Sequence, residues 1–174
     1  MYIYLFLFTG NNAIVDVLAE YGYQTLSTDI SRGEEQDFET IPRPEGNFIL
    51  VVNPPFKIRL LRIVIKKHLE WEVPCYVLYS APQWYLHRPK NMDDLFMQIN
   101  YHQLSLPCDT EFQMGENAKP AMVKADWFFL DHSKTPNQNS VSFLSWDEYN
   151  HVINPSSDKT ADDNVSACLA AMEL

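Results

Sequence analysis

Three short segments of the sequence combine residue types that bind small molecules. They are the glycine turn Thr9-Gly10-Asn11, the acid Asp29, and the turn Asn53-Pro54-Pro55-Phe56. A glycine lets the backbone approach a ligand closely, and a carboxylate at the end of a strand accepts hydrogen bonds from ribose hydroxyls in nucleotide-binding folds. An asparagine offers a side-chain oxygen acceptor, and prolines hold its turn rigid. These residue types indicate a ligand site in which Asp29 is suited to a ribose.

Alternating strands and helices are expected to bring these segments together. Apolar runs predict strands over residues 1–8, 24–28, 47–52 and 73–80, and apolar residues at helical spacing predict helices over residues 13–21 and 58–69. Strands that alternate with helices in this way form right-handed crossovers and a mostly parallel sheet. Ligands bind such sheets beyond the carboxyl ends of the strands. Because each of the three segments follows a predicted strand, all three are expected at one edge of the sheet.

The last third of the chain has a different pattern. It predicts a helix over residues 91–100 and two strands, 111–114 and 122–131, joined by a hairpin-type connection. The expected fold is therefore α/β, with a Rossmann-like, mostly parallel sheet and an antiparallel C-terminal edge hairpin. Residues 1–136 are expected to form this domain, residues 137–154 a docked polar extension, and residues 155–174 a flexible acidic tail.

Length and composition narrow the class of protein. The chain has 174 residues, enough for one domain with its own core. Its three cysteines are far apart, which argues against a secreted, cross-linked protein and predicts a cytoplasmic or nuclear one. The apolar run at residues 1–8 is too short to span a membrane, and the five histidines lack the spacing of zinc ligands. Neither membrane insertion nor a metal site is expected.

One predicted helix concentrates the positive charge of an acidic chain. The formal net charge is -10, which opposes binding to nucleic acid, yet residues 57–68 contain six Lys, Arg or His side chains and no acid. Arg59, Arg62 and Lys66 share one face of this helix. That face either contacts the phosphates of a nucleic acid or is an ordinary solvated surface. Trp84, which follows the next strand, either lines a substrate pocket or packs in the core.

The order of these motifs resembles that of a known enzyme family. The chain resembles the class I S-adenosylmethionine-dependent methyltransferases in its order of a glycine turn, a helix, Asp29, Asp37-Phe38 and Asn53-Pro54-Pro55-Phe56. Within that class, the amino-methyltransferases carry Asp/Asn-Pro-Pro-Tyr/Phe at this position. The resemblance covers residues 1–131 and implies S-adenosylmethionine as the cofactor. The implied contacts are those of Thr9, Gly10 and Asn11 with its methionine part, of Asp29 and Ile30 with its ribose and adenine, and of Asp37 and Phe38 with its adenine edge.

The resemblance also implies a chemical role for the turn at Asn53. A planar amine such as that of adenine attacks a methyl sulfonium poorly, because its lone pair is delocalised into the ring. The Asn53 side-chain oxygen and the Pro54 carbonyl would accept the two N–H bonds of the amine and favour tetrahedral geometry. Pro55 would keep the turn rigid, and Phe56 would stack on the base. The expected reaction is methyl transfer to adenine N6 in DNA or RNA, with the base flipped out of any duplex.

Other functions fit the same residues. The first turn has one glycine, whereas the family has two or three. This departure favours a catalytically inactive methyltransferase fold that acts as a binding or regulatory subunit of a protein partner. Asn-Pro-Pro-Tyr/Phe also occurs in enzymes that methylate glutamine side chains or guanine amines. Taken alone, the prolines after residue 52 suit a strand-ending loop, and Asp29 suits a helix or turn cap.

Overall fold

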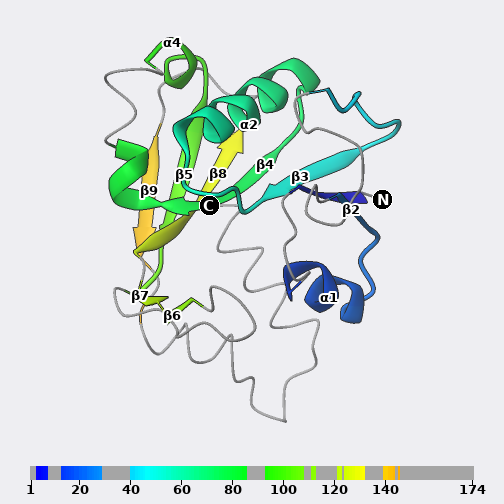
Figure 1. Cartoon of the computed structure of the whole chain (residues 1–174), viewed down its shortest axis with the longest axis horizontal. Coiled ribbons are helices and arrows are strands. Elements are labelled where there is room, and N and C mark those ends of the chain that lie inside the picture. The colour runs from blue at the N-terminus through cyan, green and yellow to red at the C-terminus, as the bar shows by residue number, and fades with distance from the viewer. Residues whose placement is uncertain are drawn as a thin grey trace.

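The first half of the fold alternates strands and helices as the sequence predicts (Figure 1). The computed structural model describes residues 3–7, 13–28, 40–85, 93–107, 111–112, 121–122, 124–131, 139–143 and 145. The elements of the first half are β1 (Ile3–Leu7), α1 (Ala13–Glu20), β2 (Thr25–Thr28), β3 (Phe48–Val52), α2 (Ile58–Trp71) and β4 (Cys75–Ser80). Their bounds follow the predicted ranges closely, so the apolar runs and helical periods identified these elements correctly.

Strands β2, β1, β3 and β4 lie side by side in that order, and each pair is parallel. Leu7 at the end of β1 lies opposite Thr28 of β2 and Val52 of β3, so the three strands end at the same level. From β1 the chain passes to β2, which lies on the side of β1 away from β3. From β3 it passes to β4, which lies on the side of β3 away from β1. The strand order therefore reverses between β1 and β3, which is the position at which open α/β sheets bind ligands.

The second half adds an antiparallel strand to the sheet. Its elements are α4 (Asp93–Phe96), β5 (Asn100–Ser105), β6 (Glu111–Phe112), β7 (Ala121–Met122), β8 (Ala125–Asp131) and β9 (Ser140–Phe143). The seven-stranded sheet has the order β2-β1-β3-β4-β8-β5-β9, in which β8 runs antiparallel to both β4 and β5. This confirms an α/β fold with a Rossmann-like, mostly parallel sheet. The expected hairpin pairing is present between β6 and β7, as a separate two-stranded sheet.

The second half differs from the expectation in its details. The antiparallel strand β8 lies inside the sheet, and the edge is β9, a strand from the predicted extension that pairs with β5 in parallel. The predicted helix over residues 91–100 is wrong beyond Phe96, because β5 begins at Asn100. β5 carries the buried polar residues Asn100, Gln103 and Ser105, which removed the apolar signal of a strand. Residues 155–174, the predicted tail, lie outside the described residues.

Helices α1 and α2 cover opposite faces of the sheet (Figure 1). On the α2 face, Leu61, Val64 and Ile65 pack with the inward residues of β1, β3, β4 and β8 in one large cluster. On the α1 face, the buried residues Phe6 and Val15 belong to a much smaller cluster. The α2 face therefore holds most of the described core. Since burial of apolar surface is the main stabilising term in folding, this face contributes most of the stability of the described part.

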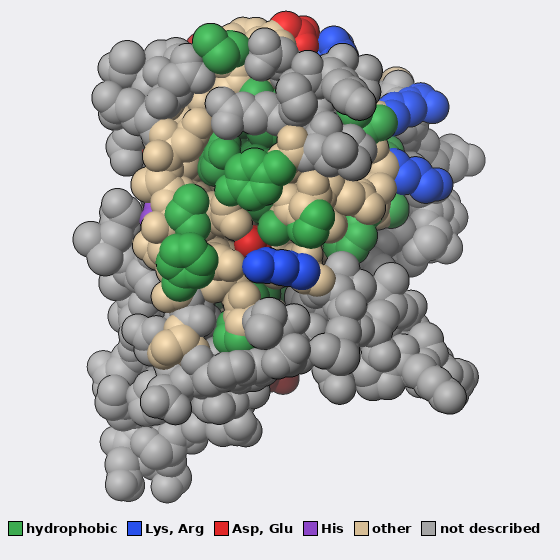
Figure 2. Space-filling view, turned by 90° about the vertical axis from the view of Figure 1, so that its left-hand side faces the viewer, with side chains coloured by type: hydrophobic (Ala, Val, Ile, Leu, Met, Phe, Trp, Pro, Cys, Tyr) green, Lys and Arg blue, Asp and Glu red, His purple; other side chains and the backbone are tan. Residues whose placement is uncertain are grey.

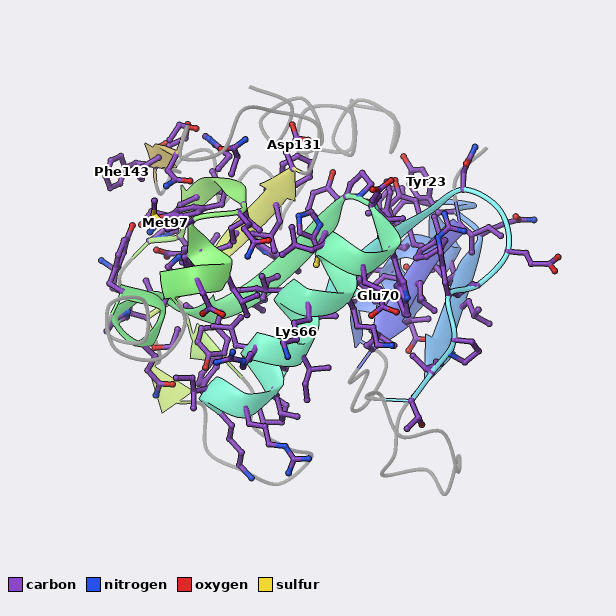
Figure 3. All side chains as sticks on the ribbon, turned by 90° about the horizontal axis from the view of Figure 1, so that it is seen from above. Tyr23, Lys66, Glu70, Met97, Asp131 and Phe143 are labelled. Carbon is purple, nitrogen blue, oxygen red and sulfur yellow. The ribbon has the colours of Figure 1, made fainter. Side chains whose placement is uncertain are left out.

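The side of the molecule that carries β9 and α4 exposes hydrophobic side chains (Figure 2). Val141 and Phe143 of β9 are exposed, Phe143 at 79%. Met97 lies at the same end of the molecule as Phe143 (Figure 3). Within the described ranges, no helix is long and apolar enough to cross a membrane.

Candidate functional site

The turn after β3 lies where the strand order reverses. Asn53 and Pro55 are exposed, whereas Pro54 is buried and Phe56 is half-buried. The Lys57 N–H donates to the Pro55 carbonyl, and α2 begins at the next residue. Prolines end the strand because they supply no N–H to the sheet. The turn therefore presents the Asn53 side chain to solvent at the carboxyl end of β3.

Two acceptors of this turn have no hydrogen-bond partner in the part of the chain that the structure describes. They are the side-chain oxygen of Asn53 and the carbonyl of Pro54, whereas the Pro55 carbonyl accepts the Lys57 N–H. Each backbone carbonyl can accept hydrogen bonds, so the Pro54 carbonyl has unused acceptor capacity. The turn thus offers two acceptors from consecutive residues to a ligand with two N–H bonds.

Phe56 connects the turn to the end of β4. Its ring meets the ring of Tyr79 edge to face, with 5.2 Å between the ring centroids. Tyr79 is fully buried, and this burial raises the pKa of Tyr79 to about 12. The Tyr79 hydroxyl therefore stays protonated at neutral pH and is a hydrogen-bond donor beneath the turn.

Trp84 lies in the core instead of at the surface. It belongs to the helical turn of residues 81–85 that follows β4. Its indole stacks on Phe128 at 3.9 Å with an interplanar angle of 13°, and it meets Phe96 and Tyr101 edge to face. The side chain is 0% exposed. The structure thus favours the packing role, and the predicted substrate contact would require the core to open at this point.

A buried carboxylate lies on the neighbouring strand. Asp126 of β8 is directly opposite Tyr79 in register and is 0% exposed. Its oxygens accept hydrogen bonds from three donors. The donors are Gln103 Nε2 at 2.6 Å, the Leu106 backbone N–H at 3.1 Å and Ser105 Oγ at 3.4 Å. The Gln103 side-chain oxygen in turn accepts a hydrogen bond from the Tyr85 hydroxyl.

The network around Asp126 was not predicted from the sequence. The available signal was an acid inside the apolar run of residues 125–130. A carboxylate in such a run is expected to be buried, and a buried carboxylate needs several hydrogen-bond donors. The network lies at the same edge of the sheet as the turn, since Asp126 pairs with the end of β4.

The basic residues on the outer side of α2 extend away from the turn. Arg59 and Lys66 are exposed, and Arg62 forms an ion pair with Asp94 of α4 at 3.4 Å. Figure 3 shows Lys66 and Glu70 along this side of the helix. Arg59 and Lys66 are seven positions apart on the helix, which is about 10 Å along the axis. This surface fits both the phosphate-contact and the solvated-surface interpretations.

Two further basic side chains of α2 are part of the core. Lys67 Nζ donates to the Ile41 carbonyl at 3.0 Å and lies 4.9 Å from the centroid of the Trp71 ring. His68 Nδ1 donates to the Val73 carbonyl at 2.6 Å. Both side chains are buried. They tie α2 to the loop before β3 and to the start of β4, so they do not contribute to the basic surface.

The residues predicted to contact a cofactor lie outside the described part of the chain. They are Thr9, Gly10, Asn11, Asp29, Ile30, Asp37 and Phe38. The strands that precede the first two of these segments are described, and β1, β2 and β3 end side by side. The contacts with methionine, ribose and adenine stay predictions. Within the described ranges, no group of three or more His, Cys, Asp or Glu side chains is placed to hold a metal ion.

Comparisons with known proteins give similarity at the level of structure. No protein-family model and no curated protein matches the sequence. Among solved structures, the chain is similar to the 23S rRNA methyltransferase ErmE, with 12% identity, a TM-score of 0.49, and coverage of 87% of this chain and 67% of that one. It is also similar to a mutant of DNMT2 from Spodoptera frugiperda, with 10% identity, a TM-score of 0.47, and coverage of 83% and 56%. At these values the similarity does not decide the function, which has to be inferred from the residues of the site.

Proposed function

We propose that the protein transfers a methyl group from S-adenosylmethionine to a planar exocyclic amine, with adenine N6 in DNA or RNA as the acceptor. The main support is the position of Asn53-Pro54-Pro55-Phe56 directly after β3, where the strand order reverses. Within the described residues, neither the Asn53 side chain nor the Pro54 carbonyl has a hydrogen-bond partner. Unused acceptors at the ligand-binding edge of an α/β sheet suit an amine that has two N–H bonds.

The turn would act on the amine through these two acceptors. S-adenosylmethionine, when bound, supplies a methyl group activated by a sulfonium. Asn53 and Pro54 would accept the N–H bonds and direct the nitrogen lone pair out of the ring plane. Positive charge develops on the nitrogen as the methyl group transfers, so these acceptors stabilise the transition state more than the bound substrate. The half-buried Phe56 ring offers a stacking surface for the base.

The ends of three parallel strands support a cofactor site beside the turn. Leu7, Thr28 and Val52 are aligned across β1, β2 and β3. The residues that follow them in sequence include the predicted contacts with methionine and ribose. A nucleoside that crosses the ends of these strands would therefore reach the turn after β3. This arrangement is the one in which open α/β sheets bind dinucleotides.

A nucleic acid acceptor would use the basic side of α2. Arg59 and Lys66 are exposed on this side, and Arg59 lies close in sequence to the turn. For single strands, the logarithm of the affinity falls with the logarithm of salt concentration by roughly 0.7 for each phosphate contacted. Affinity for a single-stranded oligonucleotide should therefore fall with salt, and replacing Arg59 and Lys66 by Ser should flatten this dependence. A flat dependence for the unaltered protein would favour a protein acceptor.

Calorimetry and a transfer assay test the proposed function directly. The protein should bind S-adenosylmethionine and its demethylated product, and it should transfer a labelled methyl group to oligonucleotides that contain adenine but not to matched ones without it. Binding without transfer to any acceptor would favour the inactive, regulatory alternative. The absence of binding at millimolar cofactor would contradict the proposal for the isolated chain.

A further inference from the structure

Three buried polar atoms in one short segment have no hydrogen-bond partner. They are the Tyr79 hydroxyl, Gln83 Oε1 and Trp84 Nε1, and no residue in the described part of the chain bonds to them. Tyr79 and Trp84 are both 0% exposed. Folded proteins pair the great majority of their buried polar atoms. Three unpaired atoms within residues 79–84 therefore call for a ligand or another specific explanation.

The neighbouring strand shows that partners are available at this depth. Asp126 is directly opposite Tyr79 and is equally buried, yet its two oxygens accept hydrogen bonds from three donors. The Tyr79 hydroxyl does not take part in that network. A buried polar side chain directly opposite Tyr79 is thus fully paired, so burial in this part of the core does not by itself prevent hydrogen bonding.

The segment borders the turn that carries the proposed function. The Tyr79 ring packs against Phe56 of the turn, and the Trp84 ring centroid lies 6.4 Å from that of Tyr79. Phe56 is only half-buried, whereas Tyr79 is fully buried. A ligand at the turn that displaces the half-buried Phe56 ring would therefore contact the Tyr79 side chain packed against it.

We propose that the Tyr79 hydroxyl donates a hydrogen bond to a ring nitrogen of the acceptor base and thereby determines which bases the site accepts. This inference rests on the proposed function and narrows its substrate class. The base should carry an unprotonated ring nitrogen near its exocyclic amine, as adenine does. Gln83 Oε1 supplies a further acceptor from the same segment. A base without the ring nitrogen leaves the hydroxyl unpaired, and sites built to hydrogen-bond a substrate discriminate strongly against such analogues.

The raised pKa of Tyr79 is consistent with a donor role. Burial moves it to about 12, so the hydroxyl keeps its proton at physiological pH. Its register partner Asp126 carries a carboxylate whose oxygens are already engaged by Gln103, Ser105 and Leu106. The hydroxyl is therefore a neutral donor with no competing acceptor among the described residues.

The variant Tyr79→Phe tests this inference because it removes only the hydroxyl and keeps the ring that contacts Phe56. The matched control is Tyr76→Phe, which lies on the same strand but on the opposite face of the sheet, where its ring packs with Phe129 at 4.3 Å. The two variants and the unaltered protein are compared in urea unfolding and in binding to single-stranded oligonucleotides. The oligonucleotides carry one adenine, one 1-deazaadenine or one 7-deazaadenine.

The expected result has two parts. Tyr79→Phe should unfold at the same urea concentration as the unaltered protein or a higher one, because the hydroxyl has no partner to lose. The unaltered protein and Tyr76→Phe should prefer adenine over one of the deaza analogues by about tenfold, the typical size of one hydrogen bond to a buried group, and Tyr79→Phe should lose this preference.

Other results would overturn the inference. A lower urea midpoint for Tyr79→Phe would show that the hydroxyl is bonded within the folded chain. The same base preference in all three proteins, or no preference in any of them, would also overturn it. Methyl transfer that keeps its base preference in Tyr79→Phe would refute the inference and leave the proposed function intact. No transfer by the unaltered protein to any acceptor would refute the proposed function, and this inference with it.

Discussion

Tyr79 and Asp126 lie opposite each other on adjacent strands, and both are 0% exposed, yet their polar atoms differ in hydrogen bonding. The Asp126 carboxylate accepts hydrogen bonds from Gln103, Ser105 and Leu106. The Tyr79 hydroxyl has no partner among the described residues. Asp126 is on β8, whose other neighbour is β5. Tyr79 is on β4, whose other neighbour is β3, the strand that the Asn53 turn follows. At this pair, the polar group toward β5 is therefore paired and the one beside the turn is not.

This difference separates two roles of buried polar groups. A paired network stabilises one arrangement of the strands and loses free energy when a member is removed. An unpaired group destabilises the free protein and is expected where a ligand completes the hydrogen bonds. The comparison can be tested by changing each side of the pair and measuring the free energy of unfolding.

The largest effect on stability is expected for Asp126→Ala. The change leaves the donors of Gln103, Ser105 and Leu106 without their acceptor in a buried site. The free energy of unfolding, measured in urea, should fall by roughly 3 kcal/mol. The exposed acid Asp16 of α1 provides a control, since Asp16→Ala should cost less than about 1 kcal/mol. Equal effects of the two changes would contradict the structural role of the Asp126 network.

A pH dependence at alkaline pH should come from the Tyr79 side of the pair. An unfolded tyrosine releases its proton near pH 10, whereas burial raises the pKa of Tyr79 to about 12. The folded state then binds more protons between these values, so its stability is complete below pH 10 and falls as the pH rises toward 12. The fall should reach about 1.4 kcal/mol per pH unit from this one group.

Tyr79→Phe should remove this part of the alkaline loss, and Tyr76→Phe should keep it. Urea unfolding at a series of pH values from neutral to strongly alkaline would measure the difference. If the stability of Tyr79→Phe declines with pH as steeply as that of the unaltered protein, burial does not raise the pKa of Tyr79 and the alkaline loss comes from another group.

A smaller effect is expected at the outer end of the paired network. The Tyr85 hydroxyl donates to Gln103, but Tyr85 is partly exposed, so water replaces some of the lost interaction in Tyr85→Phe. The free energy of unfolding should fall by about 1 kcal/mol, the usual net value of one hydrogen bond. The same hydroxyl deletion at Tyr79 should leave the free energy of unfolding unchanged, so the two tyrosines can be compared directly. A Tyr85→Phe variant more stable than the unaltered protein would contradict the stabilising role of the Tyr85 hydrogen bond.

The sequence predicted the parallel half of the fold well and the antiparallel half in part. Strands β1, β3 and β4 are runs of apolar residues, and such runs are legible without knowledge of their partners. β5 was missed because Asn100, Gln103 and Ser105 make it look polar, although all three are buried. Their burial depends on partners elsewhere in the chain, such as Asp126 for Gln103 and Ser105. Pairing of this kind is decided by tertiary structure, which local patterns do not contain.

In the candidate site, too, the features set by local sequence were predicted and those set by tertiary contacts were not. The turn at Asn53 was predicted at the end of a buried strand because prolines end strands, and the structure has it directly after Val52. The contact of Phe56 in this turn with Tyr79, 23 residues further along the sequence, was not predictable. Nothing in the local pattern links the Phe56 ring to the Tyr79 ring. Trp84 was considered for a substrate contact, but the structure surrounds it with Phe96, Tyr101 and Phe128.

The central claim is that the turn at Asn53 holds an acceptor amine for methyl transfer, and the variant Asn53→Ala tests it most directly. Asn47 provides a matched control, because it is an exposed asparagine at the opposite end of the same strand. Transfer of a labelled methyl group from S-adenosylmethionine to an adenine-containing oligonucleotide is measured for both variants, together with their urea midpoints.

Asn53→Ala should reduce the rate of transfer by roughly a hundredfold or more, as loss of one transition-state hydrogen bond does in other enzymes. Its urea midpoint should be unchanged, and Asn47→Ala should transfer at the rate of the unaltered protein. Equal rates for Asn53→Ala and Asn47→Ala would contradict the claim.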